Sequence, residues 1–238
     1  MNCLLYEPGE CGPDGSLRLT GRRAEHIRAV LRAAPGDRLI AGEIGGRLGS
    51  AAVCAVGSDA VELRVTPERD PPAPLPLTLV LALPRPKVLR RVVAGATALG
   101  VKRIHLVNTY RVEKSYWGTP FLSAAWLRRC MVAGLEQAVD TALPEIVVEK
   151  RFRPFVEDRL PAIVDGTTAL VAHPDALETV PVTVAPPVTL AVGPEGGFIP
   201  YEVDKLQQAG FRPFSAGPRI LRVEDAVPFL AGMLRLPG

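Results

Sequence analysis

The sequence predicts a small, mostly β domain followed by an α/β domain whose sheet is largely parallel. Short strand-like runs separated by Gly and Asp turns fill residues 38–65, whereas apolar runs alternate with helical segments after residue 76. Five prolines between Thr66 and Pro76 separate the two patterns, and proline-rich chain of this kind excludes helix and central strand. We therefore expect domains at residues 1–70 and 77–238, joined by a linker at 71–76.

The first domain is expected to hold three strands and one helix. The strands are Arg38–Glu43, Arg47–Val56 and Ala60–Val65, with turns at Pro35-Gly36-Asp37, Gly45-Gly46 and Gly57-Ser58-Asp59. The helix is Ala24–Leu31, where Ile27, Val30 and Leu31 recur at helical spacing.

The second domain is expected to alternate strands with helices, which favours a parallel α/β sheet that binds ligands at the carboxyl ends of its strands. The predicted strands are Leu77–Leu83, Ile104–Val107, Glu145–Val148, Ala169–Ala172 and Val188–Val192. The predicted helices are Val88–Leu99, Phe121–Ala138, one from Pro200 to Gly210, and Asp225–Leu234 with Pro228 in its first turn.

The charge of the chain is segregated along the sequence. The net charge of the 238 residues is only +3. Ten basic residues stand against one acid between Arg85 and Arg129, and five against one between Leu17 and Arg32. Residues 130–204 carry four basic and twelve acidic side chains. The two basic blocks are compatible with one phosphate-binding face or with ordinary solvated helix surfaces.

Cysteine and histidine usage indicates a reducing compartment and no metal site. The four cysteines show no CxxC pair, and the three histidines are far apart along the chain. The first residues lack a signal-peptide pattern, and no run approaches the ~18 apolar residues that a membrane helix needs. We expect a cytoplasmic protein without membrane or metal partners.

A glycine-rich turn follows the strand at Val188–Val192. Gly193, Gly196 and Gly197 let a ligand approach the backbone, and the helix that begins at Pro200 offers free amides. The segment is neither a Walker loop nor a GxGxxG fingerprint. That fingerprint is also missing after the first predicted α/β strand, Leu77–Leu83, and its lack there disfavours a nucleotide-dependent oxidoreductase. A ligand-binding loop and a tight structural turn are both compatible with it.

A second segment, Phe214–Ala226, places Arg219 and Arg222 on either side of Ile220-Leu221. The apolar pair could wall a pocket for a base ring, or it could be core with the arginines as surface charges. Glu224 and Asp225 suit the start of a helix because of its macrodipole.

These two segments, GPEGGF at 193–198 and GPRILRVE at 217–224, resemble the RsmE family of ribosomal RNA methyltransferases. Four further stretches match the family in order: His26–Asp37, Lys87–Val101, Arg111–Ser115, and Leu135–Gln137 with Pro144–Ile146. The resemblance implies an N-terminal PUA-like RNA-binding domain and a C-terminal SPOUT domain with a deep trefoil knot. It also implies a homodimer that methylates N3 of a uridine in 16S ribosomal RNA, free or within the small subunit.

The resemblance further implies that three loops hold S-adenosylmethionine, with the adenine between backbone groups and apolar side chains such as Leu170 and Ile220. The implied loops consist of Leu170, Val171, Ala172 and His173; Val192, Gly193, Pro194, Glu195, Gly196 and Gly197; and Ser215, Ala216, Gly217, Ile220 and Leu221.

Methylation at N3 requires loss of an imide proton, and this suggests two catalytic candidates. Arg222 could stabilise the developing uracil anion, whereas Glu224 could accept the proton or orient Arg222 as its ion-pair partner. The candidate RNA contacts are Arg22, Arg23, Arg28, Arg32, Arg85, Lys87, Arg90, Arg91, Arg111 and Lys114.

The chain departs from the family at two places. Val139-Asp140 stands where Gly-Arg is frequent, with Ala142 at the position of a second arginine, and Val223-Glu224-Asp225 replaces Thr-Glu-Thr. These departures leave an alternative reading, a non-catalytic RNA-binding or ribosome-assembly factor that retains the fold.

Overall fold

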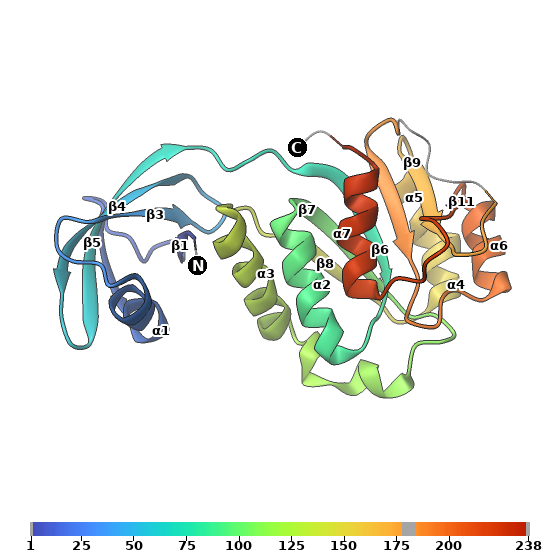
Figure 1. Cartoon of the computed structure of the whole chain (residues 1–238), viewed down its shortest axis with the longest axis horizontal. Helices are drawn as coiled ribbons and strands as arrows, with labels where there is room; N and C mark the ends of the chain where they lie inside the picture. Colours follow the sequence, from blue (N-terminus) through green and yellow to red (C-terminus); the bar gives the residue numbers. More distant parts are fainter. Residues whose placement is uncertain (1, 178–183, 237–238) are drawn as a thin grey trace. The chain divides into compact units, whose positions relative to one another are not determined.

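The computed structural model describes residues 2–177 and 184–236. The chain forms two compact units, shown in Figure 1. The first unit contains Met1–Pro72 and Val132–Leu143, and the second contains Ala73–Met131 and Pro144–Gly238. The first boundary between the two units, after Pro72, falls within the proline-rich segment. The return of residues 132–143 to the first unit has no counterpart in the division expected from sequence.

The first unit is built on a five-stranded sheet in the order β1-β3-β4-β5-β2. Its strands are β1 (Leu4–Tyr6), β2 (Ser16–Thr20), β3 (Arg38–Glu43), β4 (Leu48–Val56) and β5 (Ala60–Arg69). Helix α1 (Gly21–Glu25) continues into a π-helical turn, η1 (His26–Leu31). The helix therefore begins at Gly21, earlier than the predicted start at Ala24, and ends at the predicted residue, Leu31. Alternate residues of β2 are buried, and Leu17 and Leu19 pack with Ile27 in the core.

The proline-rich segment is shorter than the sequence suggested because strands occupy both of its ends. Strand β5 runs to Arg69, and the first strand of the second unit begins at Leu75. Pro67 is tolerated because β5 pairs with β2 only from Ala60 to Arg64, so that beyond this point one edge of β5 is open. Pro76 lies at a register shift between Leu75 and Thr78, before regular pairing begins.

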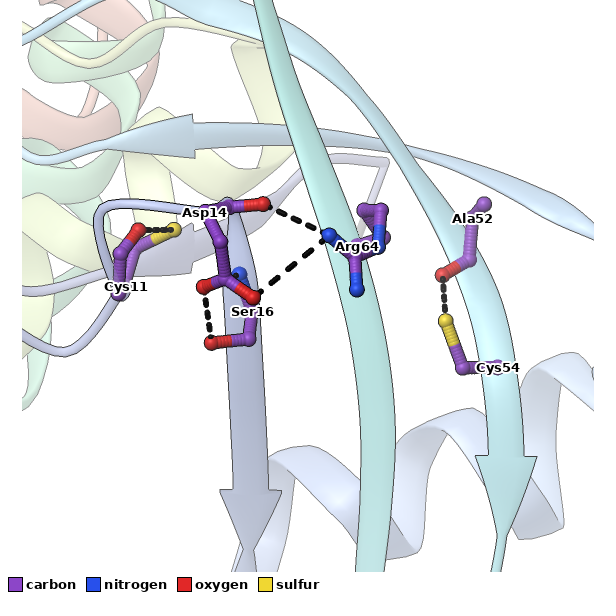
Figure 2. Close-up of polar contacts among 7 residues, drawn as sticks. Cys11, Asp14, Ser16, Ala52, Cys54 and Arg64 are labelled. Atoms are coloured by element: carbon purple, nitrogen blue, oxygen red, sulfur yellow. Dashed lines mark hydrogen bonds and ion pairs between the residues drawn. The ribbon is translucent and has the colours of Figure 1, made fainter.

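The loop that leads into β2 is fastened to β5 (Figure 2). The Arg64 guanidinium donates to the backbone oxygen of Asp14 at 2.8 Å, and the Asp14 carboxylate accepts from the Ser16 hydroxyl at 2.6 Å. The nearby thiols of Cys11 and Cys54 contact the carbonyl oxygens of Gly12 and Ala52. The bonds of Asp14 to Arg64 and Ser16 fix the entry into β2.

Residues 132–143 contribute a second apolar cluster to the first unit. Helix α3 (Ala124–Ala138) ends there, and Leu135, fully buried, packs with Cys3, Leu5 and Leu48. Burial raises the pKa of the Cys3 thiol to about 12, so this cysteine is an unreactive core residue. At the end of α3, Val139 adopts a φ of +58°, a left-handed conformation that favours glycine. The Asp140 carboxylate then accepts from the Ala142 amide at 2.9 Å.

The second unit has a six-stranded sheet in the order β11-β9-β10-β6-β7-β8. Its strands are β6 (Leu75–Ala82), β7 (Val101–Val107), β8 (Glu145–Glu149), β9 (Thr168–Ala172), β10 (Val188–Val192) and β11 (Arg212–Phe214). Every pairing is parallel, which confirms the predicted α/β class. Because β10 returns to pair with β6, the strand order reverses there, and such reversals open a crevice at the carboxyl ends of the strands.

Helices α2 (Pro86–Ala98) and α7 (Val223–Met233) pack against each other over this sheet (Figure 1). Helix α6 (Pro200–Gln208) precedes β11, and short 3₁₀ turns η2 (Lys114–Gly118) and η3 (Pro120–Leu122) precede α3. Several predicted boundaries shift by one to three residues, and two of the shifts change the element or turn in which a residue lies. Helix α7 begins at Val223 rather than Asp225, so that Pro228 lies inside the helix and not in its first turn. Phe121 belongs to η3 rather than to α3.

A helical segment between β8 and β9 was not predicted. It comprises α4 (Phe152–Pro154), the π-helical η4 (Phe155–Arg159) and α5 (Leu160–Val164). Phe155 and Leu160 are buried, and the Phe155 ring lies 5.7 Å from the His105 ring. Pro154 and Pro161 interrupt the helical pattern in the sequence, which hides the segment.

Within residues 2–177 and 184–236, no helix has the length and apolarity needed to cross a bilayer. In the same part of the chain, no group of three or more His, Cys, Asp or Glu side chains is arranged to hold a metal ion.

Candidate functional site

A pocket lies at the carboxyl ends of β9, β10 and β11, within the second unit. The loop after each strand supplies part of its wall, so the structure brings together the three segments predicted to hold a cofactor. The predicted residues that line it are Ala172, His173, Val192, Gly193, Pro194, Glu195, Gly197, Ala216, Gly217, Ile220 and Leu221.

The remaining four predicted residues do not line the pocket. Leu170 and Val171 are buried inside β9, so of the two apolar side chains expected around a base ring only Ile220 reaches the pocket. Ser215 ties two loops together, because its hydroxyl lies 3.3 Å from the carbonyl oxygens of Pro174 and Gly217. The carbonyl oxygen of Gly196 accepts a hydrogen bond from Arg111.

Sequence reasoning missed part of the pocket wall. Helix α7 contributes Val223, Ala226 and Leu230, which share one helical face because they follow one another at intervals of three and four. That spacing is visible in the sequence, and it could have identified these three residues as one face of a helix beside the pocket. The other additional lining residues are Pro174, Phe198 and Arg219.

The loop after β10 is held in place by the start of α6. Gly197 has a φ of +73°, which explains a glycine at this turn. The buried Glu202 carboxylate accepts from the backbone amide of Ile199 at 3.0 Å and from that of Tyr110 at 2.6 Å. One carboxylate therefore joins the helix start to the loop that follows β7.

A groove of about 740 Å³ adjoins the pocket. Glu195 lines both spaces, and its carboxylate accepts from the backbone amide of Arg85 at 3.0 Å. This bond ties the glycine-rich loop to the start of α2. The groove is lined by four cationic side chains, two aromatic rings and two carboxylates, with Pro86 and Val88 beside them: Arg85, Lys87, Arg91 and Arg222; Tyr116 and Phe121; Glu195 and Glu224.

The two catalytic candidates face this groove and have different surroundings. Arg222 precedes α7 and is exposed, and within residues 2–177 and 184–236 its guanidinium makes no hydrogen bond or ion pair. Glu224 pairs instead with Arg91, at 2.8 Å. The expectation that Glu224 orients Arg222 as an ion-pair partner is therefore wrong. In the first turn of α7, Glu224 is directed at the neighbouring helix α2.

The predicted RNA contacts in the second unit fall into two groups. Arg85, Lys87 and Arg91 line the groove. Arg90 and Lys114 are exposed but lie outside its lining, and Arg111 is engaged with the carbonyl oxygen of Gly196.

In the first unit, three of the four predicted contacts already have acidic partners. Arg22 pairs with Glu136 at 3.1 Å and Arg28 with Glu25. Arg23 binds Glu10 through two nitrogens, at 2.8 and 2.6 Å, and also donates to the Leu5 carbonyl oxygen. Arg32 is exposed and lies in the left-handed region at the end of η1. Arg23 is thus a structural residue of this unit.

The Arg23–Glu10 pair predicts a pH-dependent stability. Hydrogen bonds from Arg23 lower the pKa of Glu10 to about 2 from its usual 4.5. A carboxylate with a lowered pKa stabilises the fold above pH 4.5 and loses this contribution as the pH falls towards 2.

We expect Glu10→Gln to lower the free energy of unfolding by about 0.5–1 kcal/mol at pH 7. Urea unfolding should show this gap narrowing as the pH falls from 4.5 towards 2. Glu62→Gln, on the exposed side of β5, serves as the control, and an equal loss in both variants would refute the role of the pair.

Comparisons with known proteins match this architecture. A family model described as an RNA methyltransferase domain matches residues 71–235. The ribosomal RNA small subunit methyltransferase E of Treponema pallidum is 32% identical over 234 residues, which cover 95% of this chain and 87% of that protein. A second protein of the same name, from Mycobacterium tuberculosis, is 27% identical and covers 89% of this chain and 83% of its own length.

Two solved structures resemble this chain in fold. A putative methyltransferase from Legionella pneumophila, in complex with the bound cofactor S-adenosylmethionine, has a TM-score of 0.75 and 26% identity, with 98% of this chain and 96% of that chain covered. The fold is shared by a ribosomal RNA small subunit methyltransferase E from Neisseria gonorrhoeae, with a TM-score of 0.74, 20% identity, and coverage of 98% and 95%. The chain therefore belongs to the RsmE family, the family of ribosomal RNA small subunit methyltransferase E.

Proposed function

We propose that this protein transfers a methyl group from S-adenosylmethionine to N3 of a uridine in 16S ribosomal RNA. The observation that carries the proposal is the junction of the two spaces described above. A largely apolar pocket formed by three loops opens beside a cation-lined groove, and Glu195 lines both. A small charged cofactor and an RNA phosphate backbone are the ligands that this pairing suits.

The residues present fit S-adenosylmethionine. Ile220, Leu221 and Val223 offer apolar contacts for a base ring, while the backbone of the glycine-rich loop supplies polar groups nearby. The Glu195 carboxylate lies at the boundary with the groove, where a sulfonium charge is favoured electrostatically. The cofactor supplies an electrophilic methyl group when it is bound.

The chain's own side chains would serve the proton chemistry. Uracil N3 loses its imide proton as the methyl group is transferred, and negative charge develops on the ring. Arg222, which faces the groove with an unpaired guanidinium among the described residues, would stabilise that charge. Glu224 is held by Arg91 at 2.8 Å, which supports a positioning role over that of the proton acceptor.

The proposal includes the architecture that the family resemblance implies. We infer a trefoil-knotted SPOUT domain, a PUA-like first domain that grips RNA, and a homodimer. The parallel sheet with loops converging at its carboxyl edge supports the first of these. All four cysteines are free thiols, which supports the reducing cytoplasm as the site of action.

The decisive experiment maps methylated nucleotides in 16S ribosomal RNA from cells with and without this protein. A single N3-methyluridine that disappears with the gene and returns on complementation is the expected result. Titration calorimetry with S-adenosylmethionine tests the pocket independently. If the protein binds small subunits, produces no heat with the cofactor and leaves methylation unchanged, it is a non-catalytic assembly factor.

RNA binding should depend steeply on salt. With the four cations of the groove engaged, the plot of log K against log salt should have a slope of about −3 for single-stranded RNA. Lys87→Ala should make the slope shallower by about 0.7, whereas Lys102→Ala, on β7 outside the groove lining, should leave it unchanged. Filter binding between 50 and 300 mM salt checks this, and a flat response would contradict phosphate contacts.

A further inference from the structure

We propose that Tyr116 and Phe121 form the stacking platform for the target base, which enters the groove unpaired. This inference rests on the proposed function and names residues that position its substrate. Both residues line the groove and are half-buried, so that part of each is accessible to a ligand in the groove. Among the described residues that line the groove, they are the only aromatic ones.

Neighbouring side chains hold the Phe121 ring and the backbone that carries Tyr116. The Phe121 and Trp126 rings pack edge to face, with ring centroids 5.0 Å apart and planes at 73°. Tyr116 sits in η2, where its carbonyl oxygen accepts from the Thr119 hydroxyl at 2.9 Å. Next to it, the Trp117 indole donates to Asn108, at the end of β7, at 2.9 Å. A preorganised aromatic surface binds a planar base at low entropic cost.

The surrounding charges suit the phosphates on either side of such a base. Arg85 and Lys87 are exposed at the start of α2, and the Arg91 side chain is 63% exposed despite its ion pair with Glu224. A guanidinium has five N–H donors, so Arg91 retains donors for a phosphate. Aromatic rings beside a cationic rim are the combination that recognises single-stranded nucleotides.

The platform also lies close to the proposed chemistry. Arg222 lines the same groove, and Glu195 marks the opening towards the cofactor pocket. A base stacked on Tyr116 and Phe121 would therefore lie in the same groove as Arg222, next to the cofactor pocket. Paired bases cannot reach such a surface, because stacking on it requires the base to leave its helix.

The test uses equilibrium fluorescence with a single-stranded oligoribonucleotide carrying 2-aminopurine between uridines, because stacking quenches this base and the readout needs no turnover. We expect quenching by the wild-type protein that is lost in Tyr116→Leu and Phe121→Leu. Tyr116→Phe and Phe121→Tyr should retain it, since they preserve the stacking surface and control for misfolding. Tyr201→Leu, on exposed α6 outside the groove lining, is the matched aromatic control.

Methyl transfer to undermethylated small subunits provides the second readout. Loss of stacking on one ring should raise KM for RNA by about tenfold, with kcat less affected and the Kd for S-adenosylmethionine unchanged. Equal quenching and equal KM in wild type and both leucine variants would overturn the platform, even if methylation is intact. Normal quenching with no methyl transfer by the wild type would instead overturn the proposed activity and leave the platform standing.

Discussion

Replacing Arg222 by alanine should reduce kcat for methyl transfer by about 10²–10³-fold, the usual cost of removing one group that stabilises transition-state charge. Arg222 faces the groove, does not line the cofactor pocket, and has no ion-pair partner among the described residues that its loss would leave unpaired. The Kd for S-adenosylmethionine and the melting temperature should therefore stay near their wild-type values. Single-turnover methylation together with calorimetric titration of the cofactor separates these effects.

Two variants serve as controls for this result. Arg219 lines the cofactor pocket but not the groove. Arg219→Ala should therefore raise the Kd for S-adenosylmethionine more than it lowers kcat. Glu224→Gln preserves the shape of the side chain beside Arg91 and should cost much less than Arg222→Ala if Glu224 only positions its neighbour. Unchanged turnover in Arg222→Ala would remove this residue from the mechanism, and a deep loss with an altered pH profile in Glu224→Gln would identify Glu224 as the proton acceptor.

The second large effect is expected at Gly49, in the sheet of the first unit. A Cβ atom there would lie 1.9 Å from the carbonyl oxygen of Thr66 and 2.8 Å from the Cα of Pro67. Gly49 pairs with Pro67 next to a register shift between β4 and β5, so the two strands must separate to admit a methyl group. We expect Gly49→Ala to lower the free energy of unfolding by about 2–4 kcal/mol.

Urea unfolding measures this loss, and Gly57→Ala in the same unit is the matched control. A Cβ at Gly57 meets only the Ala60 carbonyl oxygen, at 3.4 Å, an ordinary contact that should leave stability nearly unchanged. Because the cofactor pocket consists of residues of the second unit, Gly49→Ala should weaken RNA binding while cofactor affinity is retained. Equal stability of the two variants would show that the strands yield without cost.

Local sequence signals predicted the elements around the cofactor pocket. Two signals mark the borders of the glycine-rich loop: the apolar run Val188–Val192 before it and Pro200 after it. The structure has β10 at Val188–Val192 and the first residue of α6 at Pro200. Pro200 is informative because it needs no backbone donor at a helix start. The three-residue strands β1 and β11 have too little periodicity to be recognised.

Contacts between distant parts of the chain were beyond sequence reasoning. Arg91 and Glu224 are 133 residues apart, and no local pattern indicates that α2 and α7 pack together. Leu170 is likewise buried, in β9, which lies between β10 and β11, two strands that follow it in the sequence. Proximity in the sequence to a recognised motif therefore predicted which loops form the pocket and most of their lining residues, but not the burial of Leu170 or the contribution of α7.

The return of residues 132–143 to the first unit limits how this protein can be dissected. A cut within the proline-rich segment would give an N-terminal fragment without Leu135 and without Glu136, whose carbonyl oxygen accepts from the amides of Asn2 and Cys3. The complementary fragment would carry the apolar end of α3 without its packing partners. Neither unit is a contiguous stretch of sequence, so exchanging modules between relatives at a single crossover would produce misassembled chimeras. A workable exchange needs three crossovers, with residues 132–143 travelling together with residues 1–72.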